Sequence, residues 1–169
     1  IYGMGERPVV EIARRLQRGE SIDRLTNIPQ TAVIRPRATI PSTIEDEHNI
    51  VLASHEECLQ HKRKQAENFR HIEEESNKYH AKRLWQSVGE QVIVVNPPYP
   101  PMTEAEIDAS FDLPYTRMPH PRYKGKTIPA YEMIKFSVNL HRGCFGGCAF
   151  CTISAHQGKF IASRSKESI

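Results

Sequence analysis

The sequence predicts an α/β protein, and three patterns along its 169 residues support this. Apolar residues recur at helical spacing between Val9 and Leu16, which indicates an amphipathic helix. Residues 91–95 form a run of mostly β-branched side chains, which is typical of a strand. Between residues 134 and 140 apolar and polar side chains alternate, which is the period of a half-buried strand.

The first helix is expected to begin near Pro8, because proline suits the first turn of a helix, and to stop at Gly19. A short strand is expected over residues 31–35. Gly3 and Gly5 form a short glycine pattern, but Pro8 stands where a dinucleotide-binding loop needs its third glycine. The opening segment is therefore expected to be a plain packing unit.

A long helix is expected over residues 54–85, after an irregular stretch at 37–53. Ser54 and Glu57 form a capping box at its start. Its apolar stripe is thin and consists of Leu59, Ala66, Phe69, Ile72, Tyr79 and Leu84. This predicts a surface helix that is buried along a narrow seam. The basic run at 61–64 is interpreted as a solvated helix face, with RNA binding as the weaker alternative.

Further elements are expected after this helix. The β-branched run at 91–95 predicts a strand buried on both faces, as in a parallel sheet. Thr103 and Glu106 form a second capping box, which opens a short helix ending near Phe111. Residues 112–129 are rich in proline and basic side chains and are expected to form a linker or lid.

Three cysteines near the end of the chain carry the strongest functional signal. Cys144, Cys148 and Cys151 follow the spacing C-x3-C-x2-C. Three thiolates on one loop can hold three irons of a cubane iron–sulfur cluster and leave the fourth iron open for chemistry. The alternatives are unligated thiols or a structural zinc site, in which His141 or His156 completes a Cys3His set.

The surroundings of the cysteines suit a metal loop. The glycines at 143, 146 and 147 permit unusual backbone angles and a close approach of amides to sulfur. The fourth cysteine, Cys58, lies far away in sequence and is interpreted as a packed thiol. As a fourth ligand it would close the open iron.

This spacing resembles the signature of the radical S-adenosylmethionine (SAM) superfamily. The lead-in at 135–140, Arg142 and Gly143, and the stretches at 158–159 and 163–169 resemble its YgiQ-type branch. The resemblance implies a [4Fe-4S] cluster on the three cysteines whose open iron binds the amino and carboxylate groups of SAM. The reduced cluster would split SAM and give a 5′-deoxyadenosyl radical. The resemblance also implies that Phe150 lies near the adenine of SAM and that an electron donor is a partner.

The resemblance further implies a partial fold. Residues 1–36 would end a cobalamin-binding-like, flavodoxin-type α/β domain. Residues 37–129 would be a connecting segment with the long helix, a strand and a Pro-rich linker. Residues 130–169 would begin the radical SAM core, with the first strand and the cluster loop of a (β/α) barrel. The chain is accordingly interpreted as part of a longer enzyme and as inactive on its own.

Composition sets further limits. Hydrophobic residues make up 38% of the chain, and its mean hydropathy is −0.55, so a modest core and much loop are expected. The net charge of +3 is too small to favour nucleic acid as a partner. No apolar run approaches the roughly 20 residues that a membrane span needs. Reduced cysteines and an oxygen-sensitive cluster predict a cytoplasmic location.

Overall fold

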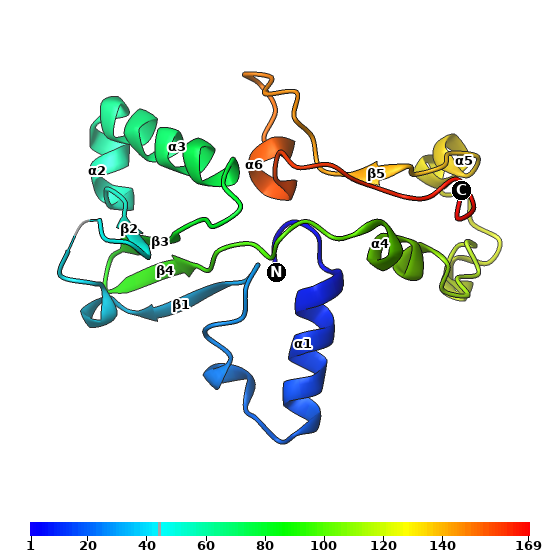
Figure 1. Cartoon of the computed structure of the whole chain (residues 1–169), viewed down its shortest axis with the longest axis horizontal. Coiled ribbons are helices and arrows are strands. Elements are labelled where there is room, and N and C mark those ends of the chain that lie inside the picture. Colours follow the sequence, from blue (N-terminus) through cyan, green and yellow to red (C-terminus); the bar gives the residue numbers. More distant parts are fainter. Residues whose placement is uncertain (44) are drawn as a thin grey trace. The chain divides into compact units, whose positions relative to one another are not determined.

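The computed structural model describes residues 1–43 and 45–169, and the chain forms two compact units. The first unit comprises Ile1–Pro101 and Gly143–Ile161, and the second comprises Met102–Arg142 and Ala162–Ile169. Helices and strands are combined in both (Figure 1). The predicted α/β class is therefore confirmed, whereas the flavodoxin-like and barrel assignments stay predictions.

A four-stranded mixed sheet, in the order β1-β4-β3-β2, is the centre of the first unit. Its strands are β1 (Ala32–Pro36), β2 (Asn49–Val51), β3 (Arg83–Val88) and β4 (Gln91–Val95). β4 pairs antiparallel with both β1 and β3, whereas β2 and β3 are parallel. Opposite faces of the sheet carry two apolar clusters, one around Trp85, Val92 and Val94 and one around Ile50, Leu52 and Leu84.

The pairing of β4 corrects one prediction. Residues 91–95 do form a strand, but the strand is antiparallel to both neighbours rather than part of a parallel sheet. Val92 and Val94 are buried, whereas Ile93 between them remains exposed. The run of β-branched residues therefore indicated a strand correctly. It did not predict burial or strand orientation, because both depend on the strands and helices that lie next to it.

The first unit also contains helices. They are α1 (Glu6–Gln17), α2 (His55–Gln60), α3 (Lys62–Ser76) and α6 (Ile153–Gln157), with single turns η1 (Ile22–Arg24) and η2 (Arg37–Thr39). α1 starts and stops close to the predicted positions, and Gly19 after it has φ +84°. The capping box of Ser54 and Glu57 is present at the start of α2. Ile72 of α3 packs against the apolar cluster around Leu84.

The helix expected over residues 54–85 is wrong in extent. His61 has extended backbone angles and separates α2 from α3, and α3 ends at Ser76. Leu84 and Trp85 belong instead to β3, where both side chains are buried in the sheet clusters. The Trp85 indole N–H also donates to Asn49 Oδ1 at 2.8 Å. Tertiary burial therefore decided this segment, because helical spacing alone contributes little to stability.

The second unit is smaller. It contains α4 (Glu104–Phe111), a turn η3 (Pro121–Tyr123), α5 (Pro129–Ile134), and the two-residue strands β5 (His141–Arg142) and β6 (Ala162–Ser163). β5 and β6 pair antiparallel. α4 begins with the predicted capping box of Thr103 and Glu106. The core of this unit consists of Met102, Ile107 and Ala162, and Phe111 packs against them.

The strand expected over residues 134–140 is wrong. Ile134 ends α5, and pairing starts only at His141. Phe136 is 89% exposed, and Val138 and Leu140 are also exposed. Alternation creates one apolar face, but a strand needs a neighbour to bond with its backbone. Within the described part of the chain, β6 is the strand that pairs here, and it reaches only two residues.

No helix of the described residues is both long enough and apolar enough to cross a membrane.

Candidate functional site

The cysteine loop starts at Gly143, which is buried and has φ +90°. A Cβ atom at this position would lie 2.1 Å from the carbonyl oxygen of Phe160, so only glycine fits. The Gly143 N–H donates to Gln157 Oε1 at 3.4 Å, and the Cys144 N–H donates to the Gly158 carbonyl at 3.1 Å. The base of the loop is thus bound to the chain that leaves it.

Two of the three predicted ligands lie close together. A Cβ atom on Gly146 would stand 3.4 Å from Cys144 Sγ and 3.7 Å from Cys148 Sγ. Both sulfurs therefore border the position that a side chain at residue 146 would occupy. Cys151 follows a turn in which its N–H donates to the Cys148 carbonyl at 3.0 Å. All four cysteines of the chain are free thiols, and Cys148 is exposed.

The donor set suits a soft metal or an iron–sulfur cluster, because thiolates are the ligands that such centres prefer. Across residues 1–43 and 45–169, however, no three His, Cys, Asp or Glu side chains are already gathered as a metal site. The fold places Cys144 and Cys148 near Gly146, and Cys151 would have to move to complete a ligand set with them. Such completion is common, since the free energy of metal binding also organises the ligands.

Two aromatic side chains stand out from this loop. Phe150, which the sequence singled out, is 91% exposed, and Phe145 is largely exposed as well. A large apolar ring in water is unfavourable unless a partner covers it, so both are candidates for contact with a ligand or another part of the protein. Phe145 was missed by sequence reasoning, although its place directly after Cys144 was the available signal.

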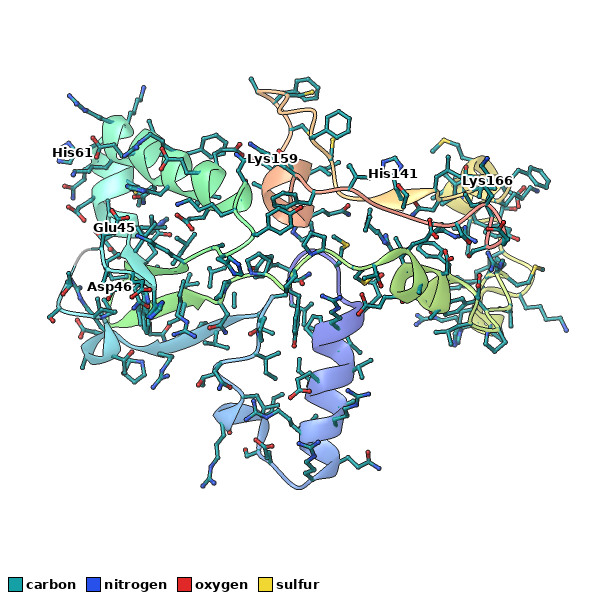
Figure 2. The ribbon with its side chains drawn as sticks, in the orientation of Figure 1. Glu45, Asp46, His61, His141, Lys159 and Lys166 are labelled. Atoms are coloured by element: carbon teal, nitrogen blue, oxygen red, sulfur yellow. The ribbon has the colours of Figure 1, made fainter. Side chains whose placement is uncertain are left out.

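The predicted histidine ligands differ in their surroundings. His156, on α6, accepts a hydrogen bond from the Gly3 N–H through Nδ1 at 3.5 Å. This leaves Nε2 as its remaining ring nitrogen. His141 lies in β5 of the second unit and is exposed (Figure 2). Cys58 is in α2, where its sulfur accepts from Asn68 Nδ2 at 3.1 Å, which agrees with a packing role.

The chain that leaves the cysteine loop is fixed to α3. α6 lies beside the carboxyl-terminal end of α3 (Figure 1). Lys159 Nζ pairs with Glu73 Oε2 at 2.7 Å. The ring of Phe160 packs on the ring of Tyr79 with 4.1 Å between centroids. These contacts had no signal in the sequence, since the paired residues are more than 80 positions apart.

A cavity of about 310 Å³ lies next to α6 in the first unit. Its walls include Tyr2, Glu75, Leu84, Asn96 and Tyr99, and α6 contributes Ala155 and His156. Its buried polar groups are already paired within the fold. Glu75 accepts from Lys78 Nζ and the Lys82 N–H, and the Tyr2 hydroxyl donates to the Asn96 carbonyl. Burial raises the pKa of the Tyr2 hydroxyl above its usual value, so it stays a donor.

Comparison with known proteins identifies one family model and several similar proteins. A family model described as Radical SAM N-terminal matches residues 1–137. A UPF0313 protein of Porphyromonas gingivalis is 66% identical over 169 residues, which is all of this chain and 26% of that protein. A UPF0313 protein of Bacteroides thetaiotaomicron is 63% identical, again over the whole chain and over 28% of that protein.

A more distant relative is the UPF0313 protein YgiQ of Salmonella typhimurium, which is 34% identical across the whole chain and 30% of its own length. The chain therefore spans between a quarter and a third of the length of these three curated relatives. No solved structure matches the chain.

Proposed function

Because the chain belongs to the Radical SAM N-terminal family, we propose that it carries the metal-binding loop of a radical SAM enzyme. Cys144, Cys148 and Cys151 are the proposed ligands of a [4Fe-4S] cluster, and SAM is the proposed second cofactor. When bound, the cluster would supply one electron, received from a separate donor, and a carbon–sulfur bond of SAM would break to give methionine and a 5′-deoxyadenosyl radical. The observation that carries this proposal is the approach of two thiols across Gly146.

The residues of the loop have separate tasks in this proposal. Gly146 keeps the space next to Cys144 Sγ and Cys148 Sγ free of side-chain atoms. Gly143 lets the loop turn directly against the Phe160 carbonyl. Hydrogen bonds at the base restrict the loop before a metal arrives, which lowers the entropy that binding must remove.

Phe150 is assigned to the adenine of SAM. Its ring is exposed and lies one residue before Cys151, so it can offer a flat apolar face to a purine close to the metal ligands. Replacement of Phe150 by leucine is expected to weaken SAM binding and to leave iron content unchanged. Replacement of Phe145 by leucine is the matched comparison, because it removes a second exposed ring of the same loop.

The decisive experiment uses the longer protein that contains this chain, purified without air and supplied with iron, sulfide and reductant. We expect a broad visible absorption, about four irons per chain, and conversion of SAM to 5′-deoxyadenosine. Cys144→Ala should abolish all three, because an iron without its thiolate destabilises the cubane. Cys58→Ala is the control, since this thiol packs in α2, and it should retain all three.

Zinc is the outcome that would overturn the proposal. A structural Cys3His site would retain zinc, contain neither iron nor sulfide and leave SAM intact. His156→Gln would then reduce zinc content, because Nε2 of His156 is the ring nitrogen that the Gly3 N–H does not engage. Unchanged SAM cleavage by Cys144→Ala would equally refute the role given to that residue.

A further inference from the structure

The segment at 158–160, which leaves the cysteine loop, is held by side chains from a distant part of the first unit. We call it the exit segment. Lys159, labelled in Figure 2, pairs with Glu73 of α3 at 2.7 Å, and only 19% and 27% of these side chains are exposed. Phe160 packs on Tyr79, which follows α3, with ring planes inclined by 37°. Two neighbouring residues of the exit segment are thus fixed by two different kinds of contact.

The exit segment in turn holds the base of the cysteine loop. The Phe160 carbonyl lies against Gly143 so closely that no side chain fits between them. The Gly158 carbonyl accepts from the Cys144 N–H at 3.1 Å. A continuous series of contacts therefore leads from Glu73 and Tyr79 through the exit segment to the first predicted metal ligand.

The ion pair in this series differs from an exposed pair on the same helix. Arg70 and Glu74 also pair at 2.9 Å, but 61% and 48% of their side chains are exposed. Pairs exposed to that degree contribute little, because water and salt screen them. The pair of Glu73 and Lys159 is screened less, and it joins residues 86 positions apart rather than one helical turn. It therefore restrains tertiary structure, whereas the other pair only adds to the helix.

We propose that Glu73 and Tyr79 are positioning residues of the cysteine loop. By fixing the exit segment they hold Cys144 in place, so that the thiols meet with little loss of freedom when a metal binds. The inference rests on the proposed function for the identity of that metal. It gives the N-terminal part of the chain a task in the metal site although that part supplies none of the three proposed ligands.

Cysteine reactivity in the metal-free chain tests the proposal directly. A short pulse of N-ethylmaleimide is followed by peptide mass spectrometry, which measures each of the four cysteines separately. In Glu73→Gln and in Tyr79→Ala, Cys144 should react roughly 3- to 10-fold faster, because each change removes a contact that holds the exit segment and so favours local opening. Cys148 is already exposed, so its labelling should change by less than about twofold.

Two controls make the labelling specific. Glu74→Gln removes the neighbouring exposed pair on α3 and should leave Cys144 labelling at the unmodified rate. Cys58 reports on the integrity of α3, because its sulfur contacts Asn68 of that helix. If Glu73→Gln also increases Cys58 labelling, Lys159→Met decides, since it removes the same pair from the loop side and leaves α3 unaltered.

A charge exchange provides the rescue. Glu73→Lys combined with Lys159→Glu should return Cys144 labelling toward the unmodified rate, whereas either change alone should raise it. The proposal is overturned if Cys144 labelling stays unchanged in Glu73→Gln, Tyr79→Ala and Lys159→Met while Cys58 remains protected. An equal response to Glu74→Gln would overturn it as well.

The metal-bound state supplies a second readout. In the longer protein, reconstituted with iron and sulfide, Glu73→Gln should lose iron to a chelator several-fold faster than Glu74→Gln. The two proposals fail separately. If no variant binds iron but the labelling pattern holds, the radical SAM function is wrong and the positioning role stands. If iron binds and Cys144 labelling does not respond to the variants, the positioning role is wrong and the radical SAM function stands.

Discussion

Replacing Gly143 by alanine tests whether the close contact at the base of the cysteine loop holds that loop. At φ +90° a residue with a side chain is strained by roughly 1–2 kcal/mol. Its Cβ would also lie 2.1 Å from the Phe160 oxygen, so the backbone must move. That movement separates the Cys144 N–H from the Gly158 carbonyl, a bond worth about 1 kcal/mol. Loop opening should become easier by about 2–3 kcal/mol.

Amide hydrogen exchange at Cys144 measures this effect, and Gly147→Ala is the matched control. Gly147 also has positive φ, at +59°, but no atom lies within 4 Å of its would-be Cβ. Gly143→Ala should speed exchange roughly 30- to 150-fold, whereas strain alone in Gly147→Ala allows about 5- to 30-fold. Equal exchange in the two variants would refute the reasoning, because backbone strain would then explain the whole effect and the contact with Phe160 none of it.

Three further predictions concern the loop, the core and the response to acid. Gly146→Ala should leave the urea unfolding midpoint unchanged but reduce iron retained after reconstitution, because its Cβ enters the space between two thiols; full retention would contradict the role of that space. Val92→Ala should cost about 2 kcal/mol in urea unfolding, because Val92 is fully buried, whereas Ile34→Ala on an exposed strand position should cost under about 0.5 kcal/mol. Hydrogen bonds from the His48 N–H and from Asn49 hold the pKa of Asp46 below its usual value of 3.8. A carboxylate with a lowered pKa stabilises the fold above that value and loses the effect as pH falls through the lowered pKa. Asp46→Asn should therefore weaken the fold at neutral pH and flatten the acid limb of its stability curve, and an unchanged acid limb would contradict this.

Elements with local chemical signals were predictable from the sequence. Ser54 with Glu57 and Thr103 with Glu106 each satisfy backbone amides at a helix start, and both capping boxes are present. Gly19 ends α1 for a similarly local reason, because it adopts a positive φ that other residues resist. Such signals involve three or four neighbouring residues, so no knowledge of the remaining fold is required to read them.

Elements decided by distant contacts were not predictable. Leu84 fits the helical spacing of the preceding residues, yet it lies in β3 because the sheet buries it against Ile50. Residues 134–140 alternate like a strand but lack a neighbour over that length among the described residues. The domain division at residues 36 and 129 rested on resemblance and stays a prediction.

The candidate site divides in the same way. The three cysteines are singled out by their spacing and stay proposed ligands, and the structure places Cys144 and Cys148 near Gly146. The sequence could not single out Glu73 and Tyr79, because an acidic residue and a tyrosine are ordinary in a charged helical region. Only the fold brings them to Lys159 and Phe160.

The solvent-exposed side chains of Phe136, Val138 and Leu140 have a practical consequence for experiments on this chain. Alternating apolar residues that lie outside a sheet can pair between separate molecules. We therefore expect preparations of the 169-residue chain to become turbid, or to elute early in size-exclusion chromatography, as the protein concentration rises. Spectra and labelling reactions should be measured at low micromolar protein concentration, and light scattering should be recorded in parallel to detect aggregates.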